Sequence, residues 1–82
     1  MIELTLYTTA GCHLCELAEA ILQTIDKQYN TTIIHTEIGD DDNLVKRYGL
    51  RIPVVKLPDD TEIGWPFELE DIESQLKYTQ TT

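Results

Sequence analysis

Cys12 and Cys15 are the residues whose type and spacing carry the clearest chemical signal, and the chain has no other cysteine. They stand in the stretch TTAGCHLCEL, with His13 and Leu14 between them. Two thiols at this spacing can bind a metal, form a structural disulfide or carry out thiol–disulfide exchange. A bridge between them closes a very short loop and removes little chain entropy, so it would be a poor structural crosslink.

The elements predicted around the pair favour redox chemistry. Residues 2–8 alternate apolar and polar side chains as a strand does, and after Gly11 the apolar residues recur at helical spacing. Unpaired N–H groups and the positive end of the dipole at a helix N-terminus stabilise a thiolate, which lowers the pKa of Cys12 and makes it the attacking thiol. Cys15, nearly one turn into the helix, is predicted to be more buried and to resolve the mixed disulfide.

The positions of the two histidines give little support to zinc binding or to acyl transfer. His13 either stabilises the Cys12 thiolate or lies in solvent at the helix start, whereas His35 falls on a predicted strand and is expected to be structural. A closed zinc site needs four ligands, and only the two histidines could join the cysteines. Acyl transfer by a Cys–His pair lacks an orienting group. No metal is expected.

The rest of the pattern predicts a single α/β domain with the order β-α-β-α-β-β-α. A right-handed crossover would pair the first two strands in parallel, and a hairpin would add two antiparallel strands. The expected architecture is a four-stranded mixed sheet flanked by three helices that cover both faces. The domain is expected to span residues 1–78, with a frayed tail over 79–82. Beyond the first strand and helix, the elements are predicted at residues 30–39 (strand), 40–49 (short helix, with Gly49 at its C-cap), 51–57 and 62–65 (strands), and 66 onward (helix).

Charge and hydropathy exclude several classes of partner. The formal net charge is −9, which disfavours binding to nucleic acid and to anionic membrane surfaces. No basic leader precedes an apolar run at the N-terminus, and no apolar segment approaches the roughly 18–20 residues that span a bilayer. A cytoplasmic monomer is expected, in a compartment where most thiols are kept reduced.

Four basic residues with no acid among them interrupt this negative charge: Lys46, Arg47, Arg51 and Lys56. They form either an ordinary solvated surface or a small basic rim around a site for an anionic ligand.

Pro53 interrupts the predicted strand at 51–57. Proline is confined to strand edges, first positions and special turns, so Pro53 is either a trans residue that begins an edge strand or a cis residue. In the cis case, the backbone of Ile52 would be free to bind an extended peptide beside Cys12.

Three features together resemble the glutaredoxin-like branch of the thioredoxin-fold superfamily: LTLYTTAGCHLCELAEAIL, then RYGLRIPVV, then a hairpin and a final helix. The resemblance covers essentially the whole chain. It implies a thioredoxin-like fold and disulfide oxidoreductase activity. It also implies that Cys12 attacks, that Cys15 resolves, and that Pro53 is a cis-proline opposite the cysteines.

The chain departs from the usual glutaredoxin motifs at several positions. His13 and Leu14 replace the Pro and aromatic residue between the cysteines, and they are predicted to set the potential and substrate preference. The glycine pair and acid that grip glutathione are reduced to Gly64 and Glu68. Arg51, beside the proline, is the candidate for holding a glutathione carboxylate.

The expectation is therefore a small dithiol–disulfide oxidoreductase with no bound cofactor. Its substrates would be protein disulfides or glutathione mixed disulfides, with glutathione as a candidate reductant or co-substrate. The alternative is a non-enzymatic binding or regulatory module of the same fold with a vestigial cysteine pair. Trp65 is expected to be a core aromatic residue that closes one sheet face, the alternative being a partly exposed side chain near the site.

Overall fold

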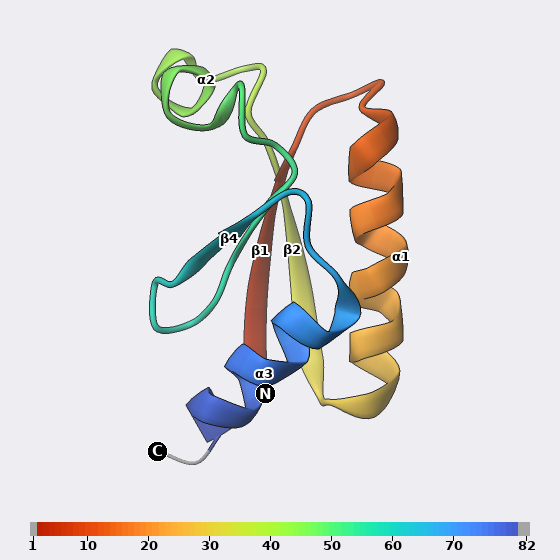
Figure 1. The fold of residues 1–82 in the computed structure, drawn as a ribbon. Coiled ribbons are helices and arrows are strands. Elements are labelled where there is room, and N and C mark those ends of the chain that lie inside the picture. The colour runs from red at the N-terminus through yellow and green to blue at the C-terminus, as the bar shows by residue number, and fades with distance from the viewer. Residues whose placement is uncertain (1, 81–82) are drawn as a thin grey trace.

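The computed structural model describes residues 2–80, and its elements follow the predicted order (Figure 1). The strands are β1 (Ile2–Thr8), β2 (Thr31–Glu37), β3 (Val54–Lys56) and β4 (Glu62–Gly64). The helices are α1 (His13–Gln28), α2 (Asp42–Tyr48) and α3 (Leu69–Gln80).

The strands form one mixed sheet in the order β2-β1-β3-β4. Strand β1 runs parallel to β2 and antiparallel to β3, and β3 pairs antiparallel with β4. The predicted α/β thioredoxin-like architecture is confirmed. The parallel pair requires a crossover, which α1 provides, whereas the short turn between β3 and β4 suffices for an antiparallel hairpin.

The main core lies between the sheet and the helices α1 and α3. Its buried residues include Leu4 and Leu6 of β1, Leu22 of α1 and Ile72 of α3. Strand alternation sends Leu4 and Leu6 to one face, and the buried stripe of α1 repeats at helical spacing, so the two patterns meet. Burial of these apolar side chains is the main stabilising contribution to the fold.

The opposite face of the sheet is covered at one end only. Helix α2 packs there through Tyr48, which clusters with Ile38 and Val54, and Tyr7 lies against this cluster. Figure 1 shows α2 standing at one end of the sheet, apart from α3. Helices therefore lie on both faces, as predicted, but α2 is too short to extend along the strands.

Several boundaries differ from the prediction. Strand β3 begins only after Pro53, and α3 begins at Leu69, where the Asp71 carboxylate accepts the Glu68 N–H at 2.8 Å. Gly49 is the C-cap of α2, as predicted, but in a right-handed helical conformation; an added Cβ would meet the Val45 carbonyl oxygen at 2.5 Å, so close approach explains this glycine. Residues 79 and 80 of the expected tail belong to α3, and 81 and 82 lie outside the described residues.

Leu22→Ala should destabilise the protein by about 2–5 kcal/mol, because the Leu22 side chain is fully buried in the main core and its removal leaves a cavity. Urea denaturation measures the loss. Leu50→Ala is the matched control, since the Leu50 side chain is fully exposed, and it should change the free energy of unfolding by no more than about 0.5 kcal/mol. Equal effects of the two substitutions would contradict this assignment of the core.

Candidate active site

A tight turn carries the chain from β1 into the helix that bears the cysteines. The Cys12 N–H donates to the Thr9 carbonyl at 3.3 Å, which closes a four-residue turn. Gly11 occupies its third position with φ +78°, where a residue with a side chain would be strained. This turn places Cys12 at the N-cap of α1, at the end of the sheet where β1 and β2 terminate.

The two cysteines are bonded to each other and differ in exposure. They form a disulfide with their Cα atoms 5.2 Å apart, within the usual range for such a bond. Cys12 is half-buried, whereas Cys15 is 5% exposed. The backbone N–H of Cys15 donates to Cys12 Sγ at 3.2 Å, so an N–H of the first helical turn is aimed at the more accessible sulfur. This is the asymmetry that the sequence predicts.

Glu37, at the end of β2, clamps the turn that precedes the cysteines. Its Oε1 accepts the Ala10 N–H at 3.0 Å and its Oε2 accepts the Gly39 N–H at 2.8 Å. Hydrogen bonds from the Thr9 hydroxyl, and from the Gly39 and Ala10 N–H groups, hold the pKa of the Glu37 carboxyl below its usual value. Sequence reasoning missed this residue. The sequence feature that could have revealed it is an acid at the end of a strand predicted to run parallel to the first strand. In the observed register Glu37 lies beside Thr8.

His13 and Leu14, between the cysteines, both lie on the surface. The His13 side chain is 80% exposed, and its Nδ1 lies 3.5 Å from Glu16 Oε2. Of the two positions predicted for His13, the solvent-exposed one is therefore observed. Leu14 and Leu17 are among the exposed large apolar side chains, so the start of α1 presents an apolar surface beside Cys12.

The segment before β3 comes to the same end of the sheet as the cysteines. Tyr7 pairs with Val54, which places the preceding Pro53 next to the end of β1. Pro53 is buried and the Ile52–Pro53 bond is cis, as the resemblance implies. The expectation that the Ile52 backbone is free is wrong for its N–H, which donates to the Tyr48 carbonyl at 3.0 Å.

Gly64 lies beside this proline segment. It pairs with Val54, and the N–H of the following Trp65 donates to the Pro53 carbonyl at 3.0 Å. An added Cβ at Gly64 would meet nothing within 4 Å, so the backbone faces open space there. The Trp65–Pro66 bond is also cis, which the sequence reasoning did not anticipate. Trp65 is half-buried rather than part of the buried core, and it packs against that core and edge-on against Phe67. It therefore combines the two positions considered for it.

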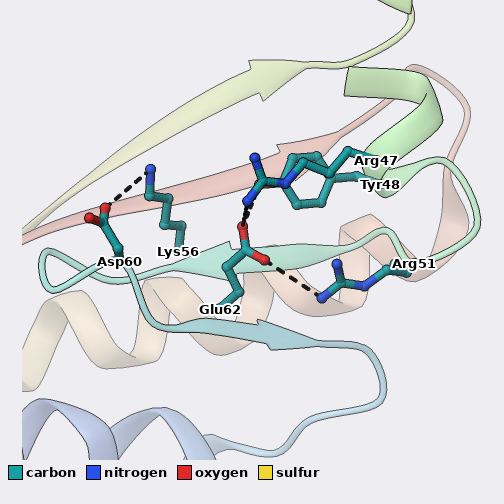
Figure 2. Close-up of polar contacts among 6 residues, drawn as sticks. All are labelled: Arg47, Tyr48, Arg51, Lys56, Asp60 and Glu62. Carbon is teal, nitrogen blue, oxygen red and sulfur yellow. Dashed lines mark hydrogen bonds and ion pairs between the residues drawn. The ribbon is translucent and has the colours of Figure 1, made fainter. Parts of the chain in front are cut away.

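Figure 2 shows two arginines converging on one carboxylate of β4. Nη2 of Arg47 and of Arg51 lie 3.8 and 3.7 Å from the Glu62 oxygens, and the Tyr48 hydroxyl donates to Glu62. Both guanidinium groups also lie within 6 Å of the Tyr48 ring centre, at 5.4 and 5.7 Å. The Tyr7 ring stacks on the Tyr48 ring with the two centroids 4.2 Å apart. Burial and the Glu62 hydrogen bond raise the pKa of Tyr48.

Three of the four basic residues divide between two acids, and Lys46 is exposed on α2. Arg47 and Arg51 share Glu62, whereas Lys56 pairs with Asp60 at 3.2 Å (Figure 2). Lys56 stands opposite Thr5 in the register, further from the cysteine end of the sheet than Val54. These basic residues are close in sequence but lie on three different parts of the fold, namely α2, the proline segment and β3, so they do not all contact the same acid.

An apolar groove of about 650 Å³ lies between α1 and the start of α3, lined by Leu17, Ile21 and residues 65–69. Leu17 is five residues after Cys12, so the groove begins about 7.5 Å along the helix axis from Cys12. Within residues 2–80, no three histidine, cysteine or acidic side chains gather as a metal site. In the same range, no helix is both long and apolar enough to cross a membrane.

Comparison with known proteins agrees with this geometry. A family model described as "Glutaredoxin-like domain (DUF836)" matches residues 3–77. No curated protein matches the chain. The structure is similar to target protein XcR50 from X. campestris, at 35% identity and a TM-score of 0.81, covering 92% of this chain and 96% of that one.

Two further solved structures extend the comparison. Protein Ne2328 from Nitrosomonas europaea is 26% identical with a TM-score of 0.79, over 90% of this chain and 89% of that one. A mutant thioredoxin from Halobacterium salinarum is 17% identical with a TM-score of 0.74, over 94% and 73% of the two chains. At that identity the thioredoxin supports the fold alone.

Glu37→Gln should loosen the turn that carries Cys12, because an amide has one acceptor oxygen where the carboxylate uses two. At pH 7 the variant should unfold at lower urea concentration, and the Ala10 or Gly39 amide should exchange its hydrogen faster. A carboxyl whose pKa is lower in the native protein than in the unfolded chain stabilises the fold at pH values above its unfolded pKa. This stabilisation is lost as the pH falls through the native pKa. The difference from wild type should therefore shrink as pH drops below the ordinary value of 4.5. A difference that is independent of pH would refute the clamp.

Proposed function

Because the chain belongs to the glutaredoxin-like domain family, we propose that it is a dithiol–disulfide oxidoreductase in which Cys12 attacks and Cys15 resolves. The observation that carries this proposal is the unequal cysteine pair at the start of α1. Cys12 is accessible and receives an N–H from the first turn, while Cys15 is bonded to it and buried. These are the properties that successive thiol–disulfide exchanges require.

The reaction consists of two exchanges. In the dithiol form, the Cys12 thiolate attacks one sulfur of a substrate disulfide; a bond forms between the two sulfurs, and the other substrate sulfur leaves as a thiolate. Cys15 then loses its proton and attacks Cys12 Sγ, which forms the Cys12–Cys15 disulfide and releases the second substrate sulfur. The substrate disulfide gains two electrons and the protein dithiol loses two. Two equivalents of an external thiol, such as glutathione, return the protein to the dithiol form by the reverse exchanges and are themselves oxidised to a disulfide.

The surroundings of Cys12 support substrates that carry apolar side chains. Exposed Leu14 and Leu17 lead from the cysteines to the apolar groove at Trp65, a surface on which a protein disulfide could dock. The accessible backbone at Gly64, beside Pro53, adds a place where an extended chain can approach closely. The proposed location is the cytoplasm, where low-molecular-weight thiols keep such a pair supplied with electrons.

Arg51 is the proposed contact for a glutathione carboxylate. Its side chain is half-exposed and stands next to the Ile52–Pro53 segment, but it already lies 3.7 Å from Glu62. An incoming carboxylate would share the guanidinium with Glu62. Arg51→Ala should therefore slow exchange with a glutathione mixed disulfide while leaving exchange with a protein disulfide that lacks this carboxylate nearly unchanged. Arg47→Ala, which alters the same Glu62 contact from α2, is the matched control. Equal rates of the two arginine variants with both substrates would remove this role.

Cys12→Ser and Cys15→Ser test the proposed reaction directly. Cys12→Ser should lose exchange with a disulfide substrate, because it removes the attacking sulfur. Cys15→Ser should instead accumulate a covalent mixed disulfide at Cys12, because nothing resolves it, and intact-protein mass spectrometry should detect the added substrate mass.

The opposing class is a binding module whose cysteine pair has no catalytic role. In that case Cys12 would react with iodoacetamide as an ordinary thiol does, with the rate rising around pH 8.5, roughly the unperturbed value for cysteine. The proposed enzyme should show that inflection at lower pH, since the helix N-terminus favours the thiolate. Activity that survives Cys12→Ser would also favour the binding module.

A further inference from the structure

A small polar pocket opens next to the cysteine pair. It has a volume of about 130 Å³ and is lined by Thr8, Thr9, Gly11, Cys12, Cys15, Glu16 and Glu19. One water needs only about 10–15 Å³ of such space together with polar partners. Hydroxyl and carboxylate groups supply those partners, so the pocket can hold a short chain of waters that reaches the sulfurs.

Only one of the two carboxylates in this pocket is held in place from a second element. Glu19 lies four residues after Cys15 on α1, hence on the same face of the helix. Its Oε1 lies 2.9 Å from Nε2 of His35, which is on β2, and its side chain is 38% exposed. Glu16 is 79% exposed and turns toward His13. The sequence predicted only a structural part in the sheet for His35, and it did not predict the contact between His35 and Glu19.

The second exchange needs a group that accepts the Cys15 proton. A thiol attacks a disulfide only as the thiolate, and the Cys15 side chain is 5% exposed, so bulk solvent has little access to it. Glu19 lines the same pocket as Cys15 and is the carboxylate that His35 holds. We propose that Glu19, held by His35, receives the proton of Cys15 through water in this pocket during the resolving step.

This inference rests on the proposed function and assigns one step of it. The proton leaves Cys15 Sγ for the Glu19 carboxylate, and the electron pair on that sulfur forms the bond to Cys12 Sγ. The bond between Cys12 and the substrate sulfur breaks, and the substrate departs as a thiolate. In the reverse direction, an incoming thiolate bonds to Cys12 Sγ, Cys15 leaves with the electron pair, and protonated Glu19 returns the proton.

The test measures the two steps separately. Reduced protein is mixed with a small aromatic disulfide in a single turnover, and the first and second thiols released report attack by Cys12 and resolution by Cys15. Glu19→Gln should leave the first release unchanged and slow the second by about a hundredfold, the lower end of typical proton-transfer contributions. Glu16→Gln is the comparison, because it removes from the same pocket the carboxylate that is 79% exposed and turned toward His13, and it should slow the second release less than Glu19→Gln does. Equal slowing by the two variants would overturn the assignment to Glu19.

Two further variants exclude indirect effects. In a Cys15→Ser background there is no resolving step, so adding Glu19→Gln should change nothing. A change there would show that Glu19 acts on Cys12 or on folding, and would overturn the inference. His35→Gln should slow the second release to a smaller extent, since it can still hold Glu19 by a hydrogen bond. Full activity of Glu19→Gln in both steps would also overturn it while leaving the proposed function intact; no first release from wild-type protein would refute the proposed function itself.

Discussion

The site depends on the N-terminus of α1 being held at the end of the sheet where β1 and β2 terminate, with a cysteine as its cap. A helix leaves its first N–H groups unpaired, and here one of them, from Cys15, is directed at Cys12 Sγ. The turn at Gly11 and the Glu37 clamp fix where that helix begins. The core stripe of α1 anchors the rest of the helix on the sheet. The same apolar burial that stabilises the fold therefore also orients the sulfur atoms.

The proline side of the site is organised by Tyr48 at the end of α2. Its carbonyl accepts the N–H groups of Arg51 and Ile52, and its ring is enclosed by Tyr7 and the arginines that share Glu62. The basic residues thus help to hold the segment leading into Pro53. Arg51 combines this structural contact with a half-exposed guanidinium, so a ligand carboxylate would have to compete with Glu62.

Local patterns predicted most of the architecture. The alternation at 2–8 and the helical stripe after Gly11 are strong periodic signals, and both elements appear where the pattern places them. The third strand was predicted too long because Pro53 cannot donate to a ladder, and pairing begins at Val54. The expected free N–H at Ile52 failed because its partner, Tyr48, belongs to the preceding helix, and periodicity does not reveal such a turn.

The sequence by itself determined the unequal cysteine pair: two thiols at helix-start spacing stand behind a strand and a glycine turn. Local spacing suffices for this, because the N–H donor and both sulfurs lie within four residues. Only the tertiary structure decided which distant groups surround that pair. Parallel pairing brings Glu37 beside Thr8 and lets His35 reach Glu19 from the neighbouring strand. Such contacts depend on strand register and helix packing, and no short-range pattern specifies them.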